Sequence, residues 1–355
     1  MTAPAGTSIG DVTLAELRLA ARNHGMPLEA LRYPVTPVGL HFLLIHYDVP
    51  VVDPETWRLT VRGERELVLG LEELRARPAA EATVTMECAG NGRARLEPRP
   101  VSQPWLLEAV GTARWRGTPL RPLLEEAGVG RDVVEVLCTG LDRGLEGGDE
   151  QAFQRAVPLD EALRDEVLLA YEMNGEPLPP QHGFPLRLVV PGWYGMTNVK
   201  WLERIELVDT PFGGYQNAWS YRLRQAEDEE GVPLNRMQPR SLMAPPGIPE
   251  FMTRDRTVAA GKVLLEGRAW SGLAPVEAVE VSVDGGESWS PAELEPAGEP
   301  WAWRGWSYRW NAEPGEHVLC CRARDTAGNE QPHEPAWNLG GYANNAVQAV
   351  RVTVA

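Results

Sequence analysis

The sequence has few cysteines, no long apolar run and no excess of basic residues. Its four cysteines form no CxxC or CxxCH motif and no paired Cys/His spacing, which excludes zinc fingers, ferredoxin-type iron–sulfur sites and c-type haem attachment. No stretch approaches the roughly 18 consecutive apolar residues of a membrane span. Lys and Arg number 34 against 50 Asp and Glu, so the net charge of −16 repels a nucleic-acid backbone. We therefore expect neither nucleic acid nor a membrane as a partner.

The first ten residues, MTAPAGTSIG, contain no basic segment, no apolar segment and no twin-arginine pair. These are the features that mark a chain for export. Their absence predicts a cytoplasmic location.

The chain length and the pattern of short runs predict two domains joined by a linker. A length of 355 residues is typical of two domains of ordinary size. Up to about residue 210, short alternating runs mix with a few helical ones, which predicts an α+β domain over 1–225. An acidic run followed by a Pro-rich stretch predicts a linker over 226–249. Beyond it every run alternates, which predicts an antiparallel β-sandwich over 250–355. The predicted helices of the first domain are 12–23, 71–77, 119–127 and 159–164.

An aromatic stripe lies in the second domain. It follows a two-residue period and comprises Trp301, Trp303, Trp306, Tyr308 and Trp310. Such a stripe is typical of a sandwich core or a subunit interface. The period is interrupted at Gly305, which predicts a β-bulge. Because a bulge can redirect a neighbouring side chain, Arg304 is a candidate to point toward a site.

Cys88 follows a predicted strand over 83–87 and begins the turn Ala89-Gly90-Asn91-Gly92-Arg93. The nearby cations Arg93 and Arg95 favour the thiolate, which is the form of cysteine that acts as a nucleophile or as a ligand of a soft metal. The spacing alone favours a buried, inert cysteine at the end of a strand.

The segment Cys88-Ala89-Gly90-Asn91 resembles the cysteine loop of the sulfite oxidase family of molybdenum enzymes. Other segments are similar to that family in the same order: WLLEAVGTARWRG at 105–117, YEMNGEPLPPQHGFPLR at 171–187, PGWYGMTNVKW at 191–201, WAWRGW at 301–306 and AWNLG at 336–340. The resemblance covers roughly residues 35–355. It implies a mixed α/β molybdopterin-binding domain followed by an immunoglobulin-like β-sandwich that forms a homodimer.

The resemblance implies a molybdenum–molybdopterin cofactor, with Cys88 as the protein's only ligand to the metal. It places further residues at cofactor-binding positions: His46, Asp142, His182, Arg187, Asn198, Val199 and Lys200. Arg187 and Lys200 fit the cofactor's phosphate by charge. We find no b-type cytochrome domain and no flavin or nicotinamide fingerprint, so we expect neither haem nor flavin, and no zinc.

The resemblance also implies a reaction, the two-electron oxidation of sulfite to sulfate with water as the oxygen source. The electrons would leave to an external acceptor, a cytochrome c or oxygen. The catalytic positions implied are Cys88, Arg93, Trp105, Tyr221 and Arg304. In this interpretation the arginines bind the small oxyanion, the tryptophan walls the pocket, and the tyrosine donates a hydrogen bond near the metal.

One departure from the family concerns the substrate. Where sulfite oxidases usually read Arg-Asn-His before a Pro, this chain reads Leu44-Ile45-His46. A charge-assisted hydrogen bond is worth about 1.5–3 kcal/mol, so its loss weakens oxyanion binding by roughly one to two powers of ten. Either another arginine substitutes, or the substrate is sulfane sulfur or an S- or N-oxide that is reduced. A cofactor-free binding protein is the third hypothesis, and the intact set of Cys88, His182, Arg187 and Lys200 argues against it.

Overall fold

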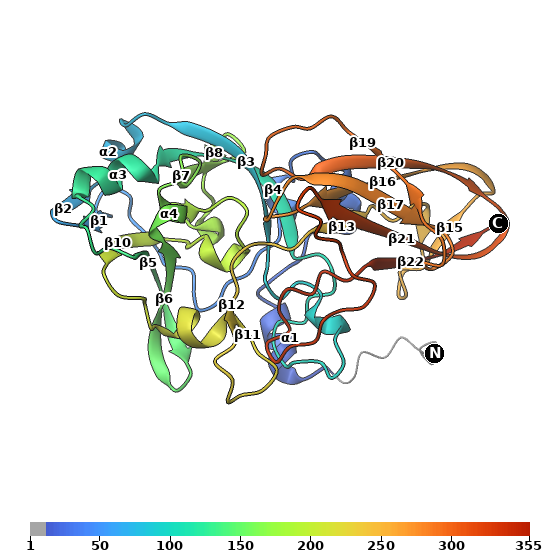
Figure 1. Cartoon of the computed structure of the whole chain (residues 1–355), viewed down its shortest axis with the longest axis horizontal. Coiled ribbons are helices and arrows are strands. Elements are labelled where there is room, and N and C mark those ends of the chain that lie inside the picture. Colours follow the sequence, from blue (N-terminus) through green and yellow to red (C-terminus); the bar gives the residue numbers. More distant parts are fainter. Residues whose placement is uncertain (1–11) are drawn as a thin grey trace.

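The computed structural model describes residues 12–355 and divides them between two domains that lie end to end (Figure 1). The first domain carries the blue to yellow segments, and the orange and red strands form the second. The N-terminal residues on which the prediction of a cytoplasmic location rests lie outside the described range. No helix within residues 12–355 is long and apolar enough to cross a bilayer.

Two sheets form the first domain, one mixed and one antiparallel. The first has the order β2-β1-β10-β5-β6, in which β1 and β10 are parallel and the other pairs are antiparallel. Its strands are β1 (Leu59–Arg62), β2 (Glu66–Leu69), β5 (Glu135–Glu146), β6 (Asp149–Pro158) and β10 (Leu202–Val208). The second has the order β3-β4-β7-β8, with β9 also paired to β7. Its strands are β3 (Ala80–Glu87), β4 (Val110–Pro119), β7 (Leu168–Met173), β8 (Glu176–Pro177) and β9 (Arg187–Val189).

The helices of the first domain are short and lie where the sequence predicts them. They are α1 (Leu14–Ala20), α2 (Leu71–Arg75), α3 (Leu120–Ala127) and α4 (Leu159–Ala162). Helix α1 begins with a capping box between Thr13 and Glu16. Helix α3 buries its leucines and ends at Gly128, whose φ of +85° suits glycine. The prediction of an α+β domain with few helices is confirmed.

Two mostly antiparallel sheets form the second domain and enclose one apolar core. One sheet has the order β13-β16-β20-β19 and the other β14-β15-β22-β21-β17-β18. The first contains β13 (Arg240–Met243), β16 (Gly261–Trp270), β20 (Arg304–Ala312) and β19 (Glu293–Leu294). The second contains β14 (Ile248–Pro249), β15 (Arg256–Val258), β17 (Val276–Ser282), β18 (Ser290–Pro291), β21 (Gly315–Asp325) and β22 (Gln348–Val354). Buried side chains from both sheets, among them Leu265, Trp306 and Val352, share one cluster. The immunoglobulin-like character of this sandwich stays a prediction.

Two features of the domain boundary matter for the site. Strand β13 lies inside the segment predicted as a linker, and it pairs with β16. The short strands β11 (Arg222–Leu223) and β12 (Val232–Pro233) precede it as a separate two-stranded ribbon.

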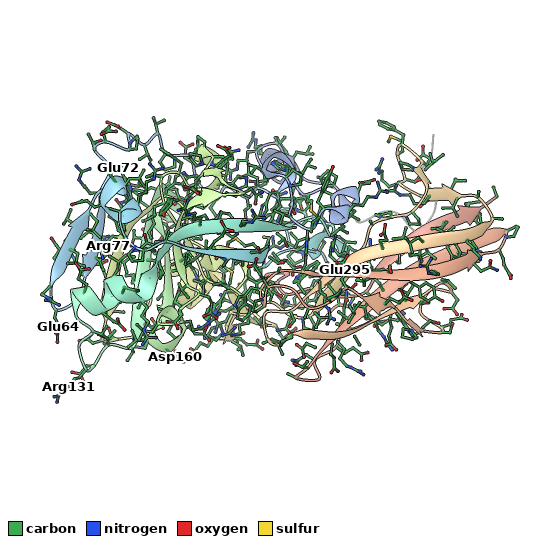
Figure 2. All side chains as sticks on the ribbon, turned by 90° about the horizontal axis from the view of Figure 1, so that it is seen from above. Glu64, Glu72, Arg77, Arg131, Asp160 and Glu295 are labelled. Carbon is green, nitrogen blue, oxygen red and sulfur yellow. The ribbon has the colours of Figure 1, made fainter. Side chains whose placement is uncertain are left out.

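Figure 2 shows Glu64, Glu72 and Arg131 at the end of the first domain that faces away from the sandwich. These surface charges therefore lie far from the boundary.

The predicted bulge at Gly305 is not present. Strand β20 pairs with β16 in unbroken register, from Gly261 opposite Ala312 to Ala269 opposite Arg304. Gly305 has another role, because a Cβ atom there would lie 2.1 Å from the Glu295 carboxyl group. The glycine gives room to a neighbouring side chain and does not kink the strand.

Candidate active site

Two cavities in the first domain meet at Cys88. The inner cavity contains most of the predicted cofactor-binding residues, namely His46, Asp142, His182, Arg187, Asn198 and Lys200. The outer cavity is lined by Arg93 and Trp105, with Gln103, Arg22 and Tyr342 beside them. Four residues line both cavities, namely Leu44, His46, Cys88 and Tyr221. The structure thus brings the predicted metal ligand to the point where the two spaces join.

Cys88 is held at the end of β3 by backbone hydrogen bonds. Its N–H donates to the Ala109 carbonyl at 2.9 Å, and its carbonyl accepts from the Asn91 N–H at 2.9 Å. Burial raises the pKa of the Cys88 thiol, and the Arg93 charge only partly opposes this effect. The prediction that nearby cations favour the thiolate is therefore wrong for the protein alone, because desolvation outweighs the cation. A positive metal ion at the sulfur reverses that balance.

Arg187 places an uncompensated cation in the wall of the inner cavity. It is 5% exposed, and its guanidinium donates to the carbonyls of His182 and Asn198 at 3.1 and 3.2 Å. Its Nε has no partner within the described residues, and the group stacks on the Trp115 ring at 4.7 Å. Burial lowers the pKa of Arg187 to about 9. A buried cation with only neutral partners is typical of a site for an anionic ligand.

Lys200 and Asp142 are two further ionisable residues of the inner cavity. Lys200 Nζ donates to the carbonyls of Leu44 and Gln181 at 2.8 and 3.2 Å. Burial lowers the pKa of Lys200 and raises the pKa of Asp142, while each charge partly offsets the shift of the other. Asp142 Oδ1 is buried without a hydrogen-bond partner in residues 12–355. This atom is free to accept a hydrogen bond from a ligand with N–H groups.

The histidines of the inner cavity are neutral. Burial lowers the pKa of His46 to about 3 and that of His182 to about 2. His46 Nε2 and the Tyr221 hydroxyl lie 2.5 Å apart. Burial also raises the pKa of Tyr221 well above its ordinary value, so the hydroxyl stays protonated and donates a hydrogen bond to the neutral His46. The pair forms a short hydrogen-bonded link beside Cys88.

Arg93 and Trp105 face the outer cavity. Arg93 is 5% exposed, and it donates to the carbonyls of Gly340 and Gln103 at 2.9 and 3.3 Å. A Cβ atom on Gly90 would lie 2.7 Å from this guanidinium, so only glycine leaves room for it. Trp105 is 5% exposed, and its Nε1 has no hydrogen-bond partner in the described part of the chain. The outer cavity therefore offers two donors near Cys88.

Leu44 makes the surroundings of the cysteine apolar. It packs with Phe42 against a buried cluster of Cys88, Trp105 and Ala109. The cations that line the outer cavity together with Leu44 are Arg93 and Arg22, and Arg22 donates to the His46 carbonyl at 3.2 Å. The oxyanion side of the site therefore has Arg93 and Arg22 as its sources of positive charge.

Arg304 and Val199 do not line either cavity. The Arg304 guanidinium donates to the carbonyls of Glu295 and Val276 at 2.7 and 3.1 Å, both in the sandwich. Figure 2 shows Glu295 on that domain. Because the expected bulge is absent, nothing redirects Arg304, and its placement at the active site is wrong. Val199 is fully buried between Asn198 and Lys200, where its carbonyl accepts from the Leu188 N–H at 2.8 Å.

Three further residues belong to the site and were not identified from the sequence. His41 lines the inner cavity, with its ring 5.5 Å from that of His182 and its Nε2 unpartnered within residues 12–355. Arg155 of β6 is buried and lies 5.5 Å from the Tyr221 ring. Tyr342 packs against Tyr221 at 5.3 Å. An arginine in a strand and a tyrosine in a loop carry no local signal of burial, so only the fold reveals them.

Comparisons with known proteins agree with this geometry. Residues 46–216 match the model of an oxidoreductase molybdopterin-binding domain, and residues 233–355 match that of a Mo-co oxidoreductase dimerisation domain. Sulfite oxidase from Gallus gallus is 38% identical over 344 residues, which cover 88% of this chain and 72% of the relative. Mitochondrial sulfite oxidase from Rattus norvegicus is 37% identical, with 90% of this chain and 62% of the relative covered. The chain thus spans about three-fifths of the length of the mammalian relatives.

Two other similar proteins bear on the range of substrates. A nitrate reductase from Hordeum vulgare is 35% identical over 90% of this chain and 39% of its own length. The solved structure of the sulfane dehydrogenase SoxCD from Paracoccus pantotrophus matches with a TM-score of 0.81 and 25% identity, over 99% of this chain and 93% of that one. Taken with the two domain models and the chicken relative, these matches mean that the chain belongs to the sulfite oxidase family, whose members are oxidoreductases that carry the molybdenum–molybdopterin cofactor.

Proposed function

We propose that this protein oxidises sulfite to sulfate, with Cys88 as the single protein ligand of molybdenum. The observation that carries the proposal is the position of Cys88, a buried free cysteine that lines both the inner and the outer cavity. A ligand atom at this junction serves a cofactor on one side and a substrate on the other. Cys138, Cys320 and Cys321 line neither of these cavities, which supports a structural role for them.

The chemistry of the inner cavity fits molybdopterin. Arg187 and Lys200 hold the phosphate, because Arg187 is a cation with only neutral partners and Asp142 offsets the charge of Lys200 only in part. Asp142 and His182 bind the polar edges of the pterin. Asn198 and Val199 lie in the same segment as Lys200 and contribute to cofactor binding there. The bound cofactor supplies a metal that accepts two electrons and exchanges oxygen with water.

The outer cavity fits a small oxyanion. Arg93 supplies the positive charge, and Trp105 walls the pocket and adds an indole N–H. Tyr221 hydrogen-bonds His46 at the junction, which holds the Tyr221 hydroxyl beside Cys88. The overall conversion takes one water into sulfite and releases two electrons and two protons. The electrons leave to an external one-electron carrier such as a cytochrome c, or to oxygen.

A further proposal concerns the oligomeric state. The dimerisation-domain match at 233–355 supports a homodimer formed through the sandwich. Light scattering at micromolar concentration tests the dimer, and a monomer there contradicts it.

The proposed function is tested by metal analysis and turnover. The protein is produced in a host that makes the cofactor, alongside Cys88→Ala and a control, Cys320→Ala, which removes another buried free cysteine. We expect near-stoichiometric molybdenum and pterin, and sulfite-dependent reduction of ferricyanide, in the wild-type protein and in the control. Cys88→Ala should lose turnover. Metal without sulfite turnover contradicts the substrate, and turnover retained in Cys88→Ala contradicts the ligand.

A further inference from the structure

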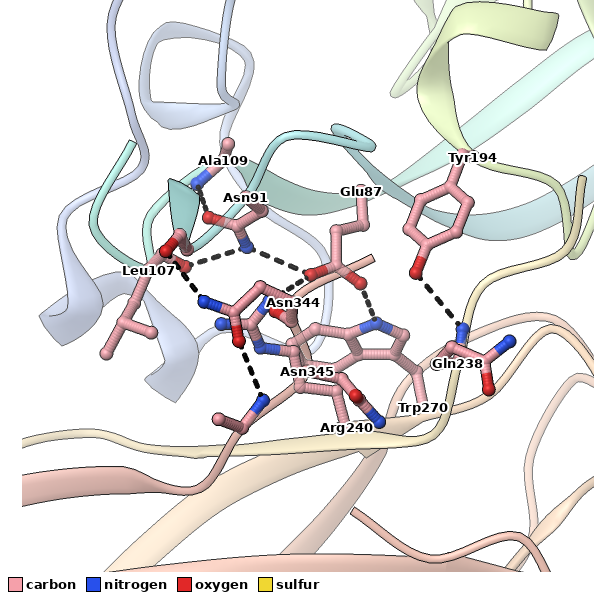
Figure 3. Close-up of polar contacts among 12 residues, drawn as sticks. Glu87, Asn91, Leu107, Ala109, Tyr194, Gln238, Arg240, Trp270, Asn344 and Asn345 are labelled. Atoms are coloured by element: carbon pink, nitrogen blue, oxygen red, sulfur yellow. Dashed lines mark hydrogen bonds and ion pairs between the residues drawn. The ribbon is translucent and has the colours of Figure 1, made fainter. Parts of the chain in front are cut away.

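A buried polar cluster lies at the boundary between the two domains (Figure 3). Its centre is Glu87, the residue before Cys88, whose carboxylate accepts from Arg240 Nη1 at 2.6 Å, Trp270 Nε1 at 2.9 Å and Asn91 Nδ2 at 3.0 Å. Consecutive side chains at the end of a strand point in opposite directions. Cys88 therefore faces the cavities while Glu87 faces the sandwich. We call Glu87, Asn91, Arg240, Trp270 and Asn344 the Glu87 cluster.

The Glu87 cluster joins the two domains. Glu87 and Asn91 belong to the first domain, whereas Arg240 on β13 and Trp270 on β16 belong to the sandwich. Arg240 Nη1 also donates to the Asn344 carbonyl at 2.9 Å. The carboxylate thus receives two of its three hydrogen bonds from the second domain.

The same part of the sandwich also holds the backbone of residues 88–93, the Cys88 loop. Asn344 Nδ2 donates to the Gly92 carbonyl at 2.7 Å, and the Ala343 N–H donates to the Ala89 carbonyl at 2.8 Å. Gly92 has a φ of +90°, and a Cβ atom there would lie 2.9 Å from Asn344 Nδ2. The loop is fixed on both sides of Asn91 by atoms from the second domain.

The energetics of the buried ion pair between Glu87 and Arg240 argue for a role in positioning rather than in stability. Glu87 is 2% and Arg240 1% exposed. A buried ion pair often contributes little stability compared with apolar residues of similar size, since desolvation cancels the attraction. Arg240 Nε and Nη2 also lack hydrogen-bond partners within the described residues, so the arginine is not fully satisfied. What the pair does provide is a fixed direction for the end of β3.

We propose that Glu87 and Arg240 are positioning residues for Cys88, through which the sandwich sets the place of the metal-ligating sulfur. This inference rests on the proposed function, because it takes Cys88 as the ligand of molybdenum. Without the ion pair the end of β3 loses its fixed direction, and the Cys88 loop shifts whether one charge or both are removed. The second domain is in this way part of the scaffold of the active site as well as a dimerisation module.

The test separates position from stability by comparing three variants. Arg240→Met breaks the pair, and Glu87→Leu/Arg240→Met removes both charges. The matched control is Arg256→Met, because Arg256 also forms an ion pair across the domain boundary, with Glu29 at 2.7 Å, and contacts no residue of the Cys88 loop. Each protein is examined by thermal unfolding, by the Mo(V) electron paramagnetic resonance spectrum of the loaded form, and by peptide-resolved alkylation of Cys88 in the cofactor-free form.

We expect Arg240→Met to raise the alkylation rate of Cys88 at least ten-fold and to shift the Mo(V) spectrum. The double variant should regain the wild-type unfolding midpoint but keep the raised alkylation and the shifted spectrum, whereas Arg256→Met should lower the midpoint alone. The proposal is overturned if the double variant regains the wild-type spectrum and alkylation together with stability, or if Arg240→Met changes only stability. If the wild-type protein binds no molybdenum, the proposed function fails, and the alkylation rates alone still support or overturn the positioning role.

Discussion

Replacement of Arg187 by methionine should stabilise the cofactor-free protein and prevent loading of the cofactor. Burial lowers the pKa of this arginine from its ordinary value to about 9, and each pKa unit corresponds to about 1.4 kcal/mol. Keeping the cation buried at neutral pH therefore costs on the order of 5 kcal/mol. Methionine removes that cost and fills much of the volume, but it leaves the carbonyls of His182 and Asn198 without a donor. Each lost hydrogen bond costs about 1–1.5 kcal/mol, so the net gain is about 2 kcal/mol.

The loading of the cofactor should change in the opposite direction. A charge-assisted hydrogen bond to a phosphate is worth about 1.5–3 kcal/mol, so affinity for the cofactor falls by roughly ten- to a hundred-fold. Urea unfolding of the cofactor-free proteins and molybdenum content after expression measure the two effects. The control is Arg164→Met, because Arg164 also stacks on a tryptophan, at 4.8 Å, yet pairs with two carboxylates. That variant should lose stability and still load. If Arg187→Met is destabilised like the control, or loads normally, the reasoning is refuted.

Three further predictions concern substrate, Arg304 and pH. Leu44→Arg adds a cation beside Cys88, so kcat/KM for sulfite should rise by roughly ten- to a hundred-fold in a ferricyanide assay; an unchanged value would mean that Arg93 suffices. Arg304→Ala should leave kcat/KM within about two-fold of the wild-type value, because the Arg304 guanidinium donates hydrogen bonds to backbone carbonyls of the sandwich. A larger loss of kcat/KM would place Arg304 at the active site. His182 stays neutral in the folded protein to about pH 2 but has an ordinary pKa of 6.5 when unfolded, so its contribution to stability is complete above pH 6.5 and is lost as the pH falls. His182→Gln should reduce the slope of unfolding free energy against pH between 6 and 4 by about 1.4 kcal/mol per pH unit, and an equal slope in both proteins contradicts this.

The sequence identifies the parts of the site that are encoded locally. The segment around Cys88 is contiguous, so its resemblance to a known loop predicts a strand end with a cysteine at the cavity. The positions of Arg187 and Lys200 follow from similar contiguous segments, and the structure brings both to the inner cavity. The alternation beyond residue 250 predicts the strands of the sandwich, because a half-buried strand has a two-residue period.

The sequence does not reveal what depends on distant partners. Arg304 was expected at the site because of a bulge, but only the register against β16 decides whether a bulge exists. Strand β13 lies in a Pro-rich segment, and all four of its residues are buried, so it lacks the alternation that marks a strand. The thiol of Cys88 is governed by burial, which its neighbours Arg93 and Arg95 do not reveal.

The cations of the inner cavity give the cofactor a structural role as well as a chemical one. In a chain with a net charge of −16, Arg187 is buried and Lys200 half-buried next to neutral carbonyls, and Asp142 supplies an opposing charge. An anionic ligand that binds here removes a desolvation cost that the cofactor-free protein carries. A ligand that binds only the folded state stabilises it in proportion to the logarithm of its concentration over its dissociation constant. Loading and folding of the first domain should therefore be coupled through Arg187 and Lys200, the two cations that we propose hold the phosphate.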